Sequence, residues 1–264
     1  GVDIDGFEGM LRARRKKPGW QILYNTQPRY RGRERFTLAH EFGHYLLHRR
    51  PLTADHYRDG ELSDDYDFEC LPLQANGWKD AEKQREEEAD TFASFLLMPI
   101  DDYRNQVGGQ EMTRDLLGHV TDRYGVSLLA ATRKWIEFTD TRAAMVVARD
   151  GFALWGRAST SAYKSGVFIR SGMPIPDGSV MAMGAALQHG SSQRPTALPN
   201  GIWTFSRGSE PVRELAFFSD RLGISVSLLQ FDGRGRGADI EEEEPWDSYD
   251  QFLDGVSESR WPHK

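Results

Sequence analysis

Two histidines one helical turn apart constrain this chain more than any other feature. The pentapeptide HEFGH at residues 40–44 has the pattern H-E-x-x-H, and the apolar spacing of residues 33–48 around it predicts a helix. At about 100° per residue, His40 and His44 share one face, while Glu41 points roughly 100° away from His40. The rest of this helix is apolar almost all round. The sequence therefore predicts a buried helix whose polar sector, with His40 and His44 as ligands, faces a metal ion and its water.

A catalytic zinc ion usually takes three protein ligands, so one more must come from another part of the chain. The predicted helix 81–98 carries three consecutive glutamates, Glu86–Glu88. A helical wheel centred on Phe92 places Glu88 inside an apolar arc and the other two at or beyond its edge. Because a carboxylate on an apolar face is costly unless it binds a cation, we expect Glu88 to be the third ligand. The alternative is a glutamate whose carboxylate reaches solvent at the boundary of the face, or one paired with an arginine.

These residue types predict metal-assisted peptide hydrolysis. Zinc lowers the pKa of a bound water to about 7, and Glu41 beside it would take up the water proton and later protonate the leaving amine. Two histidines and one carboxylate accept zinc or manganese. His48 lies in the polar sector, two turns beyond His40. Its position is as consistent with a hydrogen bond to a metal ligand, or with a capping role, as with a catalytic role. The candidate donors to the oxyanion, which the sequence does not rank, are Tyr45, His48, His56 and Tyr57.

Two blocks of the sequence resemble the ImmA/IrrE-type metallo-endopeptidases. One is RERFTLAHEFGHYLLH at residues 33–48, and the other is EADTFASFLLMP at residues 88–99, similar to the family pattern E-A-N-x-F-A followed by L-L-M-P. The resemblance covers roughly residues 5–138. It implies the following roles: His40, His44 and Glu88 as metal ligands, and Glu41 as the general base.

The chain also departs from the pattern of that family. Asp90 stands where the family usually has asparagine, which makes the surroundings of the ligand more acidic. Residues 49–80 form a longer connection than usual, which could act as a substrate-gating loop. Family members usually carry a helix and a strand before the position where this sequence starts.

The resemblance further implies a substrate class. Family members typically cleave a helix-turn-helix transcriptional repressor and so derepress stress-response, phage or mobile-element genes. Residues 112–138 are similar to the helix-turn-helix-like segment that often follows the peptidase core. A helical hairpin that packs on the catalytic helices is the favoured alternative. Direct binding to nucleic acid has weak support, because the net charge is −7, although residues 1–50 hold more basic than acidic residues.

The pattern of apolar residues changes near residue 140 and predicts an α+β chain. We expect a mainly helical zincin-like metallopeptidase domain followed by a smaller, β-rich α+β domain. The predicted helices are 36–48, 81–98, 112–124 and 127–138; the predicted strands are 143–148, 152–155, 167–169, 203–205, 215–218 and 224–231. The expected segments are the peptidase core (1–110), the helix-turn-helix-like segment (111–140), a sensor or docking domain that is GAF-like by analogy with some relatives (141–232) and an acidic linker and tail (233–264).

Composition limits the compartment and the partners. The longest apolar run has six residues, Ala143 to Ala148, which is far short of the about 20 that a membrane-spanning helix needs. A basic stretch near the start is not followed by the apolar region of a signal peptide, and the single cysteine fits a reducing compartment. We therefore expect a cytoplasmic protein with a protein substrate and no membrane partner.

Two other classes of function compete with a zinc-dependent endopeptidase. One is a regulatory module that binds DNA or protein and uses the metal only for stability. A closed structural site would need a fourth protein ligand, and the sequence offers no well-placed cysteine for it. The other is a metal-dependent toxin or hydrolase with a non-peptide substrate, which the metal site alone does not distinguish.

Overall fold

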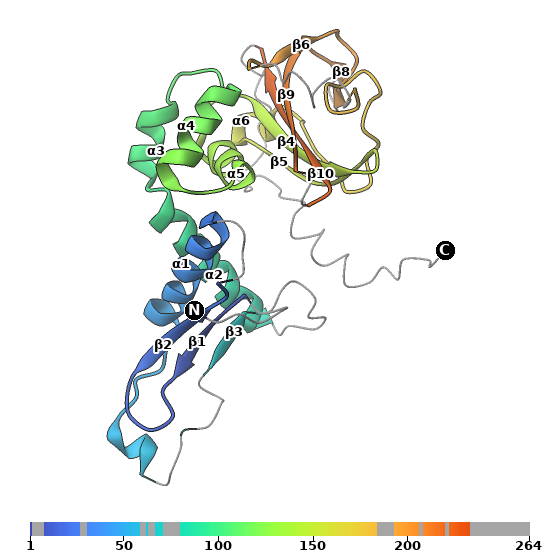
Figure 1. Cartoon of the computed structure of the whole chain (residues 1–264). Helices are drawn as coiled ribbons and strands as arrows, with labels where there is room; N and C mark the ends of the chain where they lie inside the picture. The colour runs from blue at the N-terminus through green and yellow to red at the C-terminus, as the bar shows by residue number, and fades with distance from the viewer. Residues whose placement is uncertain are drawn as a thin grey trace. The chain divides into compact units, whose positions relative to one another are not determined.

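The structure is a computed structural model that describes residues 1, 8–26, 31–58, 62, 67–70, 80–183, 193–205, 208–219 and 222–232. It combines helices with antiparallel sheets, so the expected α+β class is confirmed (Figure 1). Within the described residues, no helix has both the length and the apolar character that crossing a membrane requires.

The chain forms two compact units. Unit 1 comprises Gly1–Tyr103 and Asp122–Ser127, and unit 2 comprises Arg104–Thr121 and Leu128–Lys264. This division differs from the expected segments, because most of the predicted helix-turn-helix-like region groups with the C-terminal sheet. The acidic linker and tail expected at residues 233–264 lie outside the described residues.

Unit 1 is built on a three-stranded antiparallel sheet with the order β2-β1-β3. Leu11 lies at the centre of β1, where it pairs with Ile22 on one side and Phe68 on the other. Buried and half-buried residues alternate along β1, which gives the central strand one face directed at the core. The strands are β1 (Gly9–Ala13), β2 (Trp20–Tyr24) and β3 (Phe68–Cys70).

Two long helices complete this unit. α1 (Arg31–Leu47) packs on β1 and β2 and also against α2 (Asp80–Leu97), as Figure 1 shows. The short 3-10 helix η1 (Ala54–Tyr57) follows α1. Both predicted helices therefore form, within a few residues of the expected ends. The sheet brings β1 against the face of α1 that carries the H-E-x-x-H pattern.

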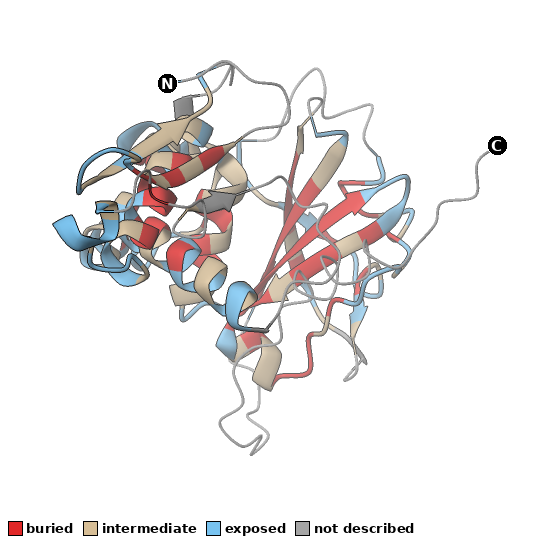
Figure 2. Cartoon of the chain, turned by 90° about the horizontal axis from the view of Figure 1, so that it is seen from below, coloured by how far each residue is buried: buried red, intermediate tan, exposed pale blue. Residues whose placement is uncertain are grey.

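Unit 2 is centred on a five-stranded antiparallel sheet with the order β5-β4-β10-β9-β6. Figure 2 shows that its central strands are largely buried. α5 packs on β4 and β5, and the strand residues Val146 and Leu229 form an apolar cluster with residues from outside the sheet, such as Trp203. The strands are β4 (Ala143–Arg149), β5 (Phe152–Ala158), β6 (Thr196–Leu198), β9 (Val212–Ser219) and β10 (Ile224–Phe231), with a separate hairpin of β7 (Thr204–Phe205) and β8 (Gly208–Ser209).

The second half follows the predicted pattern with two further helices, two further strands (β6 and β8) and one predicted strand that does not form. The sequence patterns predicted α4 and α5, but not α3 or α6. The run at residues 167–169 is not a strand, although Val167 and Ile169 are buried in the core of unit 2 from a loop. The helices are α3 (Ile100–Val107), α4 (Arg114–Tyr124), α5 (Leu128–Phe138) and α6 (Thr160–Lys164).

Candidate metal centre

The buried face of α1 is its polar face. His40, Glu41 and His44 are all buried, and His44 and Glu41 expose none of their surface. The apolar side chains that were expected to bury this helix, among them Phe42 and Leu46, are partly exposed. The expectation of a helix buried all round is therefore wrong, while the expectation that its polar sector points into the unit holds. Burying three ionisable side chains on one face is costly unless they bind one another or a cation.

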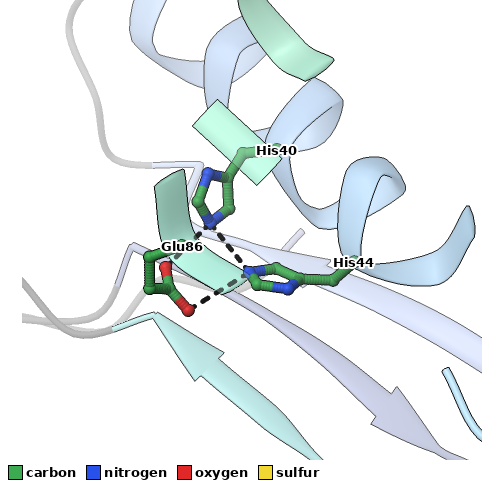
Figure 3. A group of neighbouring side chains, drawn as sticks. All are labelled: His40, His44 and Glu86. Atoms are coloured by element: carbon green, nitrogen blue, oxygen red, sulfur yellow. Dashed lines mark hydrogen bonds and ion pairs between the residues drawn. The ribbon is translucent and has the colours of Figure 1, made fainter. Parts of the chain in front are cut away.

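His40, His44 and Glu86 converge on one point (Figure 3). The Nε2 atoms of the two histidines lie 3.0 Å apart, and the Glu86 carboxylate lies 3.1 Å from His40 Nε2 and 3.3 Å from His44 Nε2. Donors bound at about 2.0–2.2 Å to a tetrahedral ion lie roughly 3.3–3.6 Å apart, so these three donors are close enough to share a single ion after a shift of a few tenths of an ångström. In the part of the chain that the structure describes, this is the one group of three or more such residues close enough to hold a metal.

The pKa values of the three groups reflect this crowding. Burial by itself would lower the pKa of His40, but hydrogen bonds to Asp90 and Glu86 outweigh it and raise that pKa to about 10. Burial lowers the pKa of His44. The pKa of Glu86 falls to about 2, because its bonds to the two histidines outweigh its burial. Without a metal, the His40 ring is thus protonated on both nitrogens and Glu86 is negatively charged. A cation at the centre would displace the proton on His40 Nε2.

The outer nitrogen of His40 has a partner of its own. Asp90, one helical turn beyond Glu86 in α2, places Oδ1 2.8 Å from His40 Nδ1. When Nδ1 carries the proton and donates it to this carboxylate, the lone pair of Nε2 points to the convergence point. A carboxylate behind a histidine is the usual arrangement at metal centres, where it fixes the tautomer and orientation of the ring.

Glu41 lies against the central strand of the sheet. A Cβ atom on Gly9 of β1 would lie 2.5 Å from Glu41 Oε1 and 2.5 Å from the Thr37 side chain. Real Cβ atoms do not approach so closely, so any larger residue at position 9 would displace the side chain of Glu41 or Thr37. The strand therefore confines the residue that follows His40 in the H-E-x-x-H pattern.

Comparison with known families agrees with this site. The profile described as the IrrE N-terminal-like domain, a peptidase family, matches residues 5–135. Residues 5–135 belong to this family. The resemblance found in the sequence is thus confirmed. A comparison with curated proteins gave no significant match.

The IrrE N-terminal-like domain of this chain does not bring Glu88 to the two histidines. Glu88 is exposed over 45% of its side chain, and its Oε2 lies 2.9 Å from His48 Nε2. Glu86, two residues earlier, occupies the place that the sequence analysis gave to Glu88. Glu87, the third member of the run, is exposed.

The physical reason lies in the orientation of α2. The wheel was centred on its large apolar residues, but Phe95 and Leu96 are 39% and 48% exposed, whereas Ala89 and Ala93 are fully buried. Relative to Ala89, Glu86 is turned by about 60° toward Ala93, while Glu88 is turned by about 100° the other way. The signal that could have shown this is Gly43 of α1, since a glycine facing small residues marks a close contact between helices.

His48 connects Glu88 to the centre. Its Nδ1 lies 2.9 Å from His44 Nδ1, and its side chain is only 6% exposed. Gln84 Nε2 donates to the other oxygen of Glu88 at 2.8 Å, and both bonds lower the pKa of that carboxyl, the bond to His48 more strongly. Of the open alternatives for His48, the geometry agrees with an outer contact to a ligand.

The other candidate oxyanion donors of the IrrE N-terminal-like domain have different contacts. His56 Nδ1 accepts a hydrogen bond from the backbone N–H of Thr53 within η1, at 3.1 Å. The Tyr57 hydroxyl donates to the Arg14 carbonyl at 2.8 Å, and the Arg49 guanidinium lies 4.0 Å from the centre of the Tyr45 ring. None of these contacts brings the three side chains to the group of His40, His44 and Glu86.

Proposed function

We propose that this chain is a metal-dependent endopeptidase with zinc as its working metal and His40, His44 and Glu86 as the metal ligands. The observation that carries the proposal is the convergence of two histidine Nε2 atoms and one buried carboxylate in a domain of a peptidase family. Three protein ligands leave a fourth position free for water or substrate, as catalytic rather than structural zinc sites do. The same donors accept manganese.

The proposed chemistry divides between the metal and the chain. When bound, the metal would polarise the scissile carbonyl and lower the pKa of a water molecule to about 7. Glu41 would accept the proton of the attacking water and deliver it to the leaving amine. Gly9 supports this role, because β1 confines the Glu41 carboxylate. Asp90 would keep the His40 ring turned with Nε2 toward the centre.

The proposed substrate is one or a few regulatory proteins, in particular a helix-turn-helix transcriptional repressor. The support for this is the resemblance to the ImmA/IrrE-type endopeptidases, which implies derepression of stress, phage or mobile-element genes. A cytoplasmic location and a sensor or docking role for residues 141–232 belong to the same proposal.

Proteolysis can be tested with Glu41→Gln, which keeps the size of the side chain and all three proposed ligands. The full chain and this variant are loaded with zinc and incubated separately with purified candidate repressors and with native lysate proteins. New peptide termini are then read by mass spectrometry. We expect discrete new termini with the parent only, while both proteins bind zinc equally. Equal cleavage by both proteins would exclude Glu41 as the base. Zinc bound without any cleavage would favour the non-catalytic module.

A further inference from the structure

A series of hydrogen-bonded side chains leads outward from His44, the second histidine of the centre. His44 Nδ1 lies 2.9 Å from His48 Nδ1, and His48 Nε2 lies 2.9 Å from Glu88 Oε2. Gln84 donates to the remaining oxygen of Glu88 at 2.8 Å. This series thus starts at the fully buried ring of His44 on α1 and ends at the exposed carboxylate of Glu88 on α2.

The chemistry of the imidazole ring fixes the direction of these hydrogen bonds. A neutral imidazole has one N–H donor and one acceptor nitrogen. If His44 Nε2 binds a cation, the proton of His44 is on Nδ1, and His48 Nδ1 must accept it. The proton of His48 is then on Nε2, where it donates to the Glu88 carboxylate. In this arrangement each of the two hydrogen bonds has one donor and one acceptor.

We propose that His48 and Glu88 are positioning residues that hold His44 with its Nε2 lone pair directed at the metal centre. Asp90 does the same for His40 through a single direct bond of 2.8 Å. One short stretch of α2 therefore supplies three carboxylates with three roles: Glu86 as a ligand, Asp90 as the direct support of one histidine, and Glu88 as the indirect support of the other. This inference rests on the proposed metal site.

Zinc affinity tests the proposal without using activity. The variants His48→Phe and Glu88→Ala are compared with the parent by competition with a chromophoric chelator. Loss of an outer support typically weakens metal binding about 10- to 100-fold. We expect a loss in that range for His48→Phe and a smaller one for Glu88→Ala. Glu88→Gln keeps an acceptor oxygen and should restore nearly the parent affinity. The matched control is Glu87→Ala, an exposed neighbour with the same change of charge, which should bind like the parent.

The tautomers give a second measurement that a merely structural role would not move. In the zinc-loaded parent, nitrogen-15 NMR of the histidine rings should find the proton of His44 on Nδ1 and that of His48 on Nε2. In Glu88→Ala, whose substitution is on the surface, the Nε2 proton of His48 loses its carboxylate acceptor, so the Nε2 signal should shift toward that of an imidazole that donates to water. Parent-like zinc affinity in His48→Phe, or a His44 Nδ1 without a proton, would overturn the proposal.

These results are separable from those on the proposed function. A parent that binds zinc but cleaves no protein would favour the non-catalytic module over the peptidase and leave the support of His44 standing. A parent that cleaves its substrate while His48→Phe binds zinc unchanged would refute only the support.

Discussion

Gly43 of α1 lies directly against the backbone of Ala89 in α2. A Cβ atom on Gly43 would be 3.2 Å from the Cα of Ala89 and 3.1 Å from the Phe92 ring. The two helices therefore approach each other closely at this point. Because Ala89 is one helical turn after Glu86, this contact determines how far the Glu86 carboxylate reaches toward the two histidines.

Substitution of Gly43 by alanine should therefore weaken the metal site. The added methyl group forces α1 and α2 apart, and overpacking of this kind costs about 1–3 kcal/mol, against a gain of about 1 kcal/mol in helix propensity. We expect lower zinc affinity and a lower or unchanged unfolding temperature. The matched control is Gly118→Ala in α4, where an added Cβ meets nothing within 4 Å. That variant should be more stable by about 0.5–1 kcal/mol and bind zinc like the parent.

Because Glu86 is the proposed third ligand and Glu88 a positioning residue, their substitutions should weaken zinc binding to different extents. Glu86→Ala removes a proposed ligand and should weaken zinc binding more than about 100-fold, beyond the loss typical of an outer support. Glu88→Ala should bind zinc far more tightly than Glu86→Ala. Isothermal titration with zinc, alongside circular dichroism to verify folding, measures both. The reverse order of affinities would restore Glu88 as the ligand.

The sequence predicted the part of the site that depends on a single helix. The turn of α1 between His40 and His44 places these two side chains on one face whatever surrounds them. The choice among Glu86, Glu87 and Glu88 depends instead on which face of α2 meets α1. That face is set by the small residues Gly43 and Ala89, whereas the wheel gave most weight to large apolar ones.

The strands of unit 1 were missed for a related reason. Met10 and Arg12 alternate with buried residues in β1, but five residues with two glycine or alanine positions carry little period-2 signal. The buried run Ala143–Ala148 was recognised as a strand because all its residues are apolar. The opposite error occurred at residues 167–169, where an apolar run fills the core without pairing in a sheet.

Without metal, the stability of the protein should decrease as the pH rises from 6.5 to 9. The His40 pKa is about 10 in the folded chain against an ordinary 6.5, so this group stabilises the fold fully below pH 6.5 and loses its contribution toward pH 10. Glu86, with a pKa of about 2 against 4.5, stabilises the fold above pH 4.5. The contribution of the pair is therefore complete between pH 4.5 and 6.5. Thermal unfolding in the presence of a chelator measures it.

Zinc binding should have the opposite pH dependence over the same range. The metal must displace the proton of His40, so zinc affinity should rise as the pH increases from 6.5 to 9. Asp90→Asn keeps an acceptor oxygen for His40 Nδ1 but removes the charge that helps to raise its pKa. In this variant, both the stability without metal and the zinc affinity should depend less on pH. If stability and affinity changed in the same direction with pH, the proton would not be on His40.

A buried carboxylate in unit 2 offers a test of stability that is independent of the metal. Glu214 in β9 is fully buried and accepts hydrogen bonds from the backbone of Val180 and Met181, at 2.9 and 3.2 Å, and from the Trp203 indole at 3.1 Å. The Ser227 hydroxyl also donates to it. Glu214→Ala would leave these donors buried and unsatisfied, at about 1–3 kcal/mol each.

We therefore expect Glu214→Ala to destabilise the fold by at least about 3 kcal/mol, with a smaller loss for Glu214→Gln, which keeps one acceptor oxygen. The free energy of unfolding is measured with urea, and zinc affinity is measured at a temperature where the variant is folded. Since Glu214 is in unit 2 and all three proposed ligands are in unit 1, zinc affinity should not change. A loss of zinc binding in a folded Glu214→Ala protein would instead mean that the two units are thermodynamically coupled.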